Sequence, residues 1–383
     1  MTLASVAILV AASVAPGATS SSYSIASAPR TLLQTRGPIA GLAHDIGWIA
    51  WMAGDPDCLD FVRSRNASRR PTLTLDTFTD VCYAAQRNPA PIAVARQRVL
   101  WTAFDIGGNH GYGNVRVGDA DGTPNPVDVQ SMIWDYVEHG EFMTDAAGDQ
   151  HLVYATAEIT HNYGDDQDAC DTARDCRYAV TGGNVFRVAG ARRVPVPRAP
   201  PAVMLAVSDR SVALVPARRT RTAATPQVLL EPTSRDSVEV RYILNGALVS
   251  RFTPSGRILA LGLSRDWIAV LVVRGAPRVE IREVDTGRVV KSVPAPAQTD
   301  QIGISHSTVV LATRSALYLL DTDSGDVRPL AVAKRPLGVS TRVAASSGRR
   351  TSPTPALESA SSSSTDAIQT LKRTLRTSPS STT

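Results

Sequence analysis

The sequence predicts an all-β chain that folds as a single β-propeller of four-stranded blades. The first observation is a pattern of apolar strand, tight polar turn and second apolar strand, which recurs six times along the 383 residues. The second is that the units continue with two further strand-like segments. The third is that no helical period of ten or more residues occurs before the C-terminal tail. Four strands per repeat of this length are typical of propeller blades.

The repeat becomes visible when residues near the start of the second strand of each unit are aligned. The six copies are IAGLAHDIGWIAWM (39–52), PIAVARQRVLWTAF (91–104), the looser MTDAAGDQHLVYAT (143–156), VMLAVSDRSVALV (203–215), RILALGLSRDWIAVLVV (257–273) and QIGISHSTVVLATR (301–314). The aligned residues are Trp48, Arg98, His151, Ser211, Trp267 and Thr308, at steps of 50, 53, 60, 56 and 41 residues. These steps match the lengths of blade repeats.

The number of blades depends on how the ring closes. The last three units show their third and fourth strands clearly, joined by short turns such as Asn245-Gly246. A seventh unit begins at PLGVSTRVAAS (336–346) and then gives way to Ser, Thr and Pro. Because an open edge strand invites aggregation, the N-terminal segments 21–27 and 30–37 are candidates to complete it. We expect seven blades with a composite or defective last blade; six blades is the alternative.

This pattern resembles the WD40-like β-propellers of exported bacterial proteins over roughly residues 35–335. The Gly-His and Trp-Asp dipeptides of eukaryotic WD40 repeats are missing, so the hydrogen-bond network tied to them is not expected. The resemblance implies a ring of blades used mostly for binding, and it names no ligand.

The remaining segments divide the chain into three parts. We interpret residues 1–19 as a signal peptide, because they begin with an uncharged apolar run of suitable length and then turn small and polar. No Lys or Arg precedes Arg30, so a buried first strand and a misplaced start codon are the alternatives. Residues 20–345 form the propeller domain, and residues 346–383 a disordered, basic tail rich in Ser, Thr and Pro. We expect a protein that is secreted or held in the cell envelope.

The four cysteines agree with export, because an even number suits disulfides in an oxidising compartment. We expect one disulfide between Cys58 and Cys82, which lie in connections on the same face of the first blade. We expect a second, local disulfide between Cys170 and Cys176, because five residues make a ring short enough to close within one loop.

The charge balance argues against nucleic acid as a partner. The net charge is +5, and residues 346–383 hold five basic residues against two acidic ones, which leaves little for the body. The body also lacks the alternation of basic and aromatic residues that single-strand platforms need. The N-terminal apolar run is short for a membrane span, so we expect no transmembrane segment after processing. We also expect the protein to be a monomer.

Motifs for catalysis are missing, since the chain has neither a G-x-S-x-G nucleophile elbow nor an H-E-x-x-H zinc motif. The segment HNYGDDQDACDTARDC (161–176) is an insertion after the second strand of the third unit. Its carboxylates suit calcium, although the D-x-D-x-D order is missing, and a solvated acidic loop is the other interpretation. The candidate calcium ligands are Asp165, Asp166, Asp168 and Asp171; no other cofactor is expected.

Long connections follow the second strand in units one to four, whereas units five and six keep this connection short. Such loops carry specificity on a rigid scaffold. The candidate binding residues are His110, Tyr112, His161 and Tyr163, expected to be exposed, with Arg218 and Arg219 in unit four. We expect a non-catalytic binding or scaffold protein of the cell envelope or extracellular space, with a protein or glycan partner on this face. The alternative is a propeller glycosidase or lyase that acts on glycans through paired carboxylates or histidines near the axis.

Overall fold

Antiparallel strands make up most of the chain that the computed structural model describes. The described residues are 5–9, 12–13, 24–25, 30–35, 39–45, 47–53, 60–66, 71–78, 91–107, 110–122, 126–135, 140–161, 177–219, 221–305 and 308–332. The chain divides into two compact units, Met1–Ala344 and Ala345–Thr383, and the second lies outside the described residues.

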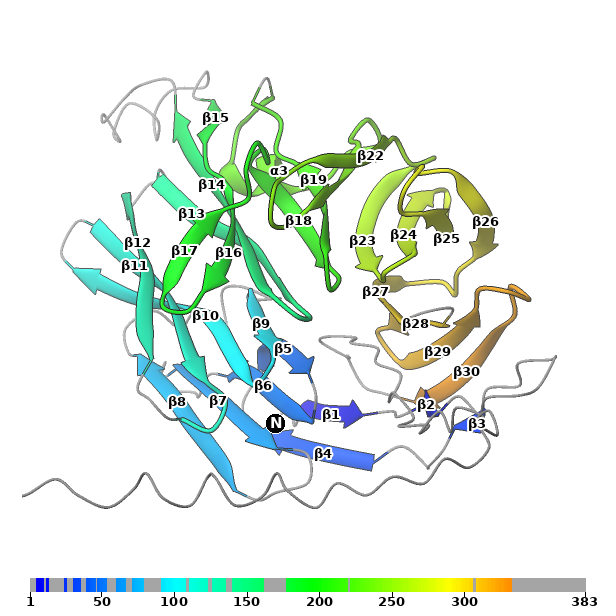
Figure 1. Ribbon diagram of the computed structural model, residues 1–383, viewed down its shortest axis with the longest axis horizontal. Coiled ribbons are helices and arrows are strands. Elements are labelled where there is room, and N and C mark those ends of the chain that lie inside the picture. The colour runs from blue at the N-terminus through cyan, green and yellow to red at the C-terminus, as the bar shows by residue number, and fades with distance from the viewer. Residues whose placement is uncertain are drawn as a thin grey trace, which may run out of the picture. The chain divides into compact units, whose positions relative to one another are not determined.

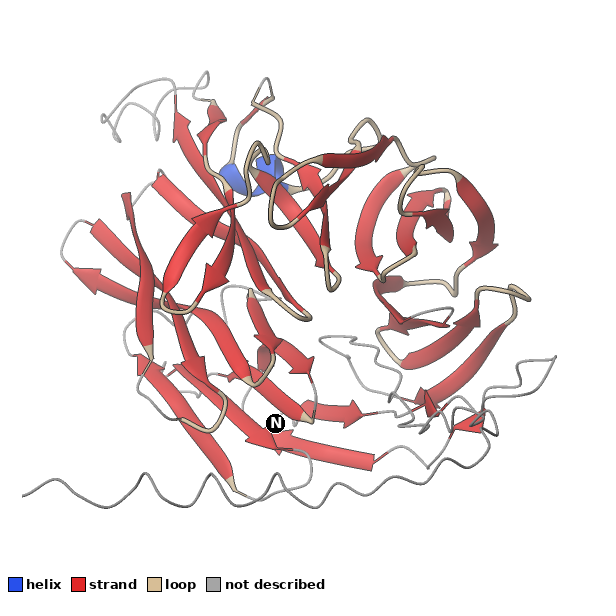
Figure 2. Cartoon of the chain, viewed as in Figure 1, coloured by secondary structure: helices blue, strands red, loops and turns tan. Residues whose placement is uncertain are grey.

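Within the described residues the strands form six four-stranded blades in chain order (Figures 1 and 2). Blade 1 holds β5 (Ile39–Asp45), β6 (Trp48–Ala53), β7 (Asp60–Asn66) and β8 (Thr72–Phe78); blade 2 holds β9 (Ile92–Ala95), β10 (Arg98–Gly107), β11 (His110–Asp119) and β12 (Val127–Asp135); blade 3 holds β13 (Gly140–Gly148), β14 (Leu152–His161), β16 (Val185–Ala189) and β17 (Arg192–Pro195). Blade 4 holds β18 (Ala202–Val207), β19 (Ser211–Pro216), β21 (Val238–Tyr242) and β22 (Leu248–Phe252); blade 5 holds β23 (Arg257–Leu263), β24 (Trp267–Arg274), β25 (Ala276–Glu283) and β26 (Val289–Pro294); blade 6 holds β27 (Thr299–Ser305), β28 (Thr308–Thr313), β29 (Ala316–Asp321) and β30 (Val327–Val332). A single pairing between Trp134 and Gly140 joins blades 2 and 3 into one larger sheet.

The predicted WD40-like β-propeller is confirmed, with six blades in the described residues rather than the seven preferred from the sequence. The repeat alignment located the second strands closely. Five of the six aligned residues are the first residue of that strand, and in blade 3 the strand begins one residue later, at Leu152. The predicted start of a seventh unit, residues 336–346, lies outside the described residues.

The N-terminal segments form two small sheets of two strands each. Strand β1 (Ser5–Leu9) pairs with β4 (Arg30–Thr35), and β2 (Ala12–Ser13) pairs with β3 (Ser24–Ile25). Strand β1 therefore lies within the run interpreted as a signal peptide.

The hydrophobic core lies between successive blades. The first strand of each blade contacts the first strand of the next, from β5 through β9, β13, β18 and β23 to β27. Each interface has its own apolar cluster; Met52 and Val62 of blade 1, for example, share one with Val94 and Trp101 of blade 2. The second strands are covered on both faces, which explains why a segment such as β24 is an almost unbroken apolar run.

The turns between the third and fourth strands need glycine. Gly246 and Gly287 have φ angles of +67° and +68°, and each donates its N–H at 2.9 Å to the carbonyl oxygen four residues earlier. A Cβ at Gly246 would meet the carbonyl oxygen of Pro197, and one at Gly287 would meet Phe252. Both contacts are with the preceding blade, so these turns help to join neighbouring blades.

Arginines at equivalent places in the third strands reinforce these turns. Arg241 and Arg282 each follow a β-bulge and each pairs with the glutamate two residues earlier, Glu239 or Glu280. Each also donates to the carbonyl oxygen of its turn glycine, at 2.9 Å in blade 4 and 2.7 Å in blade 5. Both glutamates are buried, so the ion pairs and the added hydrogen bonds offset the cost of removing the charges from water.

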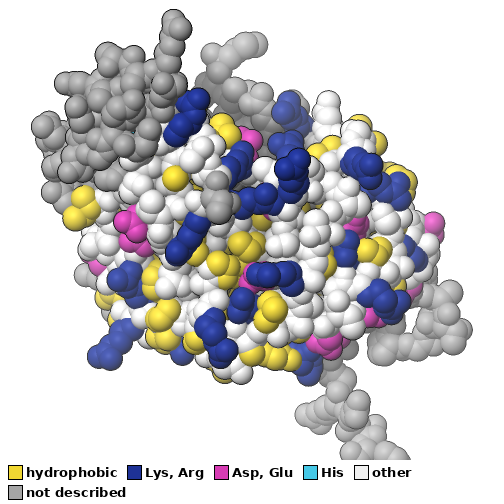
Figure 3. Space-filling view, turned by 90° about the horizontal axis from the view of Figure 1, so that it is seen from above, with side chains coloured by type: hydrophobic (Ala, Val, Ile, Leu, Met, Phe, Trp, Pro, Cys, Tyr) yellow, Lys and Arg dark blue, Asp and Glu magenta, His cyan; other side chains and the backbone are white. Residues whose placement is uncertain are grey.

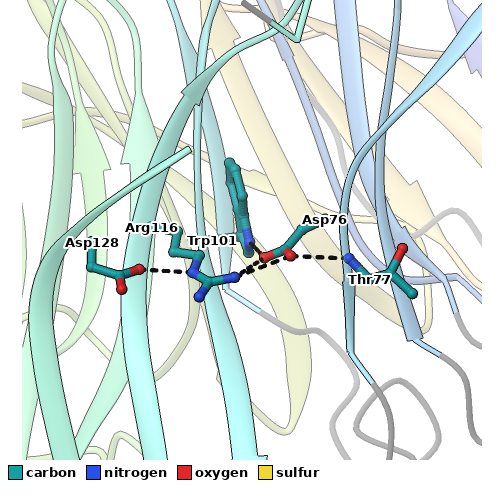
Figure 4. Close-up of polar contacts among 5 residues, drawn as sticks. All are labelled: Asp76, Thr77, Trp101, Arg116 and Asp128. Carbon is teal, nitrogen blue, oxygen red and sulfur yellow. Dashed lines mark hydrogen bonds and ion pairs between the residues drawn. The ribbon is translucent and has the colours of Figure 1, made fainter. Parts of the chain in front are cut away.

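In blade 2 the equivalent arginine, Arg116, takes its carboxylate from the neighbouring blade (Figure 4). Its Nη1 lies 3.0 Å from Oδ2 of Asp76 on β8, and its Nε lies 2.7 Å from Oδ1 of Asp128. The indole Nε1 of the fully buried Trp101 donates to the same Asp76 Oδ2 at 2.7 Å. Burial alone would lower the pKa of Arg116, but the hydrogen bonds and charges of Asp128 and Asp76 outweigh it and raise the pKa.

Strand β13 is linked to blade 4 by two polar side chains at its bulge. Thr144 Oγ1 donates to the carbonyl oxygen of Ala202 at 2.6 Å, and Asp145 Oδ2 accepts the N–H of Leu205 at 2.6 Å. Asp145 Oδ1 accepts the N–H of Ala146 at 2.8 Å. Burial raises the pKa of Asp145 to about 7, although these two backbone hydrogen bonds act to lower it.

Replacing Asp76 with Ala is expected to lower the free energy of unfolding by about 2 to 4 kcal/mol, because it leaves the buried N–H of Trp101 without an acceptor and removes the more buried partner of Arg116. The matched control is Asp128→Ala, which also removes a carboxylate from Arg116. The Asp128 side chain is 46% exposed against 10% for Asp76, so its loss should cost under about 1 kcal/mol. Urea denaturation of the three proteins measures the difference; equal losses would show that burial of the pair is unimportant.

Stability is also expected to depend on pH through Asp145. Between about pH 4 and pH 7 the carboxyl is protonated in the folded protein and ionised in the unfolded chain, so its contribution falls as the pH rises through that window. Relative to Asp145→Asn, which does not titrate, the wild-type protein should lose about 2 to 4 kcal/mol of stability between pH 4 and pH 8. Unfolding curves at several pH values test this. A difference between the two proteins that stays constant with pH would contradict it.

Candidate functional site

The connections between second and third strands distinguish blades 3 and 4 from blades 5 and 6. In blade 5 the only residue between β24 and β25 is Gly275, and in blade 6 two residues separate β28 from β29. In blade 4 residues 217–237 separate β19 from β21, and in blade 3 residues 162–184 separate β14 from β16. Because blades 5 and 6 form with short turns, the long connections are additions to the ring.

The added segments of blades 3 and 4 pair with each other. Strand β14 runs past β16, and its last part pairs with β15 (Tyr178–Gly182) after a bulge at Glu158. Strand β15 then pairs with β20 (Thr222–Ala223) from the connection of blade 4. Neither β15 nor β20 was predicted from the sequence, because both are short and their partners belong to different repeats.

A short helix, α3 (Pro226–Leu230), packs beside these strands (Figure 1). Its proline lies in the first turn, where a backbone N–H would have no acceptor within the helix, so its absence costs no hydrogen bond. A helix of five residues is not stable alone, so its packing is what holds it. Leu229 is 3% exposed within a separate apolar cluster that comprises Ala157, Ile159, Tyr178, Val180, Ala217, Ala223 and Leu229. We call residues 157–161, 178–182 and 217–230 the blade 3–4 cap.

Polar contacts also order the connection of blade 4. Arg218 forms an ion pair with Asp236 and donates to the carbonyl oxygen of Arg235. Arg221 donates to the carbonyl oxygen of Glu231 at 2.8 Å. These contacts hold both ends of the connection together.

Of the six predicted binding residues, three have side chains within the described part of the structure. His161, expected to be exposed, is buried and lies edge-on to Tyr178, with ring centroids 5.9 Å apart. Arg218 is taken up by its contacts within the connection, and Arg219 is exposed. The long connection predicted for unit two is wrong, because the segment continues the two strands and only residues 108 and 109 separate β10 from β11. His110 and Tyr112 therefore lie on β11, and their side chains are outside the described set, as is Tyr163.

The other predicted site residues are the cysteines and the candidate calcium ligands. All four cysteines, Cys58, Cys82, Cys170 and Cys176, and the candidate calcium ligands Asp165, Asp166, Asp168 and Asp171 lie outside the described residues. Among the described residues no cluster of three His, Cys, Asp or Glu could hold a metal ion. No described helix is long and apolar enough to span a membrane.

The enzyme alternative requires paired carboxylates or histidines near the axis, and two carboxyl groups on the first strands of blades 3 and 6 have raised pKa values. Burial raises the pKa of Asp145 on β13 and that of Asp300 on β27. Both oxygens of Asp145 already accept backbone N–H groups, however, so this carboxyl holds blade 4 in place.

No family of known proteins matches the sequence, and no curated protein matches it. Similar solved structures include TolB from Acinetobacter baumannii, at 14% identity, with 72% of this chain and 59% of that chain covered and a TM-score of 0.41. A nidogen/laminin complex is similar at 11% identity, with 87% and 97% covered and a TM-score of 0.41. An acylaminoacyl peptidase from Pyrococcus horikoshii is similar at 11% identity, with 78% and 46% covered and a TM-score of 0.49. At these identities the similarity concerns the β-propeller fold alone.

Proposed function

We propose that this protein is a non-catalytic binding or scaffold protein and that the blade 3–4 cap binds its partner, a protein or a glycan. The observation that carries the proposal is the pairing of β15 with β20, which joins the long connections of two neighbouring blades into one ordered element. Blades 5 and 6 show that the ring does not need such an element. Ordered additions on a rigid scaffold are where binding specificity resides.

The proposal includes a location in the cell envelope or the extracellular space. Its support is the apolar run of residues 1–19 and the even number of cysteines. The disulfides Cys58–Cys82 and Cys170–Cys176 belong to the same proposal. Peptide mass mapping of the non-reduced protein tests them; free thiols, or a link between Cys58 and either of the later cysteines, would refute the pairing.

The cap is expected to unfold locally when its small core is damaged. Leu229→Ala removes a buried side chain and should lower the stability of the cap by about 2 to 5 kcal/mol. We expect this loss to exceed the local stability of so small a cluster. Hydrogen exchange should therefore speed up in residues 178–182 and 217–230, while the blades stay protected. The neighbouring Val228→Ala is the control, because Val228 is 42% exposed and its loss should change little.

Partner binding is expected to require the exposed surface of the cap. Arg219→Glu combined with Val228→Glu alters two exposed positions and leaves the buried cluster intact. Tagged full-length protein carrying this pair should lose a partner that the wild-type protein captures from an envelope fraction and that mass spectrometry identifies. Arg265→Glu, an exposed change in the turn between β23 and β24, serves as the control. Binding that survives the cap variant and is lost in the control would place the site elsewhere on the ring.

A further inference from the structure

Blade 4 exposes two leucines at the turn between its third and fourth strands. Leu244 is 66% exposed, the highest value among the large apolar side chains of the described residues, and Leu248 is 49% exposed. This turn leaves β21 at the opposite end from the connection that forms part of the blade 3–4 cap. The two leucines therefore belong to a second surface, which does not rest on the function proposed for the cap.

The equivalent turns of blades 5 and 6 show which residue the position of Leu244 usually holds in this chain. In blades 4, 5 and 6 the turn glycine donates its N–H to the carbonyl oxygen four residues earlier, at 2.9, 2.9 and 2.8 Å. Two residues before that glycine, blade 5 has Asp285 and blade 6 has Asp323, both exposed. Aspartate is a common turn residue, so the backbone conformation does not call for leucine. Leu244 thus occupies a position where blades 5 and 6 each have an aspartate.

The surroundings of Leu244 are cationic. The turn packs against Pro197, which places it beside the exposed Arg198 of blade 3. Arg251 on β22 is largely exposed, while its partner Glu239 is buried. Outside the connection 217–237, which reaches β21 at its opposite end, residues 192–252 hold six Arg against two Asp and Glu. Figure 3, which looks onto the side that carries β15, α3 and β22, shows Lys and Arg side chains spread among apolar ones with few acidic side chains.

We propose that this turn, from Leu244 to Leu248, binds an acidic protein segment that also carries aliphatic side chains. The leucines would cover the aliphatic groups, and the arginines would attract and orient the carboxylates. Nucleic acids and glycans fit less well, because both are commonly held by exposed aromatic rings. The aromatic residues of residues 177–298 are all buried or half-buried; they are Tyr178, Phe186, Tyr242, Phe252 and Trp267.

The probe for this surface is a random-peptide library displayed on phage and selected on the full-length wild-type protein, and each selected peptide is then tested on Leu244→Asp. This substitution introduces the residue that the sister blades carry, so the turn should fold normally. Selected peptides are expected to combine Asp or Glu with Leu, Ile or Val. Their affinity, measured by fluorescence anisotropy, should fall at least about tenfold for Leu244→Asp and for Leu248→Ser. Ile133→Asp is the matched control, because Ile133 is 60% exposed on the outer strand of blade 2.

Several outcomes would overturn the proposal. Peptides that bind wild-type and Leu244→Asp protein equally, or that lack acidic residues, would show that the turn is not the site. Equal binding of heparin or single-stranded DNA, unaffected by Leu244→Asp, would indicate a general polyanion surface. A dimer in size-exclusion chromatography that Leu244→Asp dissociates would identify a second copy of the chain as the occupant. Loss of capture by the cap variant, with peptide binding retained, would leave this proposal standing.

Discussion

Contact between successive blades is the constraint on which the rest of the structure depends. In blades 2 to 5 one apolar face of the sheet is covered by the preceding blade and the other by the following blade, so we expect none of these blades to be stable alone. The clusters at these interfaces contain residues from two blades each, such as Ile281 of blade 5 with Ile302 of blade 6. Covering both faces of the second strands removes the alternation of apolar and polar residues that a sheet with one wet face would show.

Arginine–carboxylate ion pairs occur at equivalent positions of the third strands in blades 2, 4 and 5, but the carboxylate comes from different places. In blades 4 and 5 the third-strand arginine finds its carboxylate two residues earlier on its own strand. In blade 2 that position is Asn114, and Asp76 of the preceding blade supplies the charge instead. The arginine at this position therefore forms its ion pair within its own blade in blades 4 and 5, and with the preceding blade in blade 2. The same Asp76 carboxylate also accepts the hydrogen bond of the buried Trp101 indole, so it links the apolar and polar parts of this interface.

The fold was predictable because its signal is repeated and local, whereas the candidate site was not. A strand–turn–strand pattern such as that around Trp267 depends on neighbours in the sequence, and six copies located the second strands to within a residue. The pairing of β15 with β20 joins residues about 44 positions apart in different repeats, and no periodicity signals it. His161 looked like a loop residue, but the continuation of β14 past β16 buries it against Tyr178. Asp76 gave no signal either, since one aspartate in an outer strand resembles any other until its partners are known.

Total charge misleads for a molecule of this kind. The net value is small because two parts of the chain nearly cancel: residues 39–176 hold nine Arg against twenty-one Asp and Glu, while residues 177–298 hold nineteen Arg and Lys against eight acidic residues. At physiological ionic strength charges are screened beyond about 8 Å, a distance smaller than one blade. A partner that approaches blades 4 and 5 therefore meets a cationic surface, whatever the sum over the ring. The order of blades along the chain thus sets the electrostatic sides of the molecule, and blade 4 combines the cationic side with the exposed Leu244, at a position where blades 5 and 6 carry aspartate.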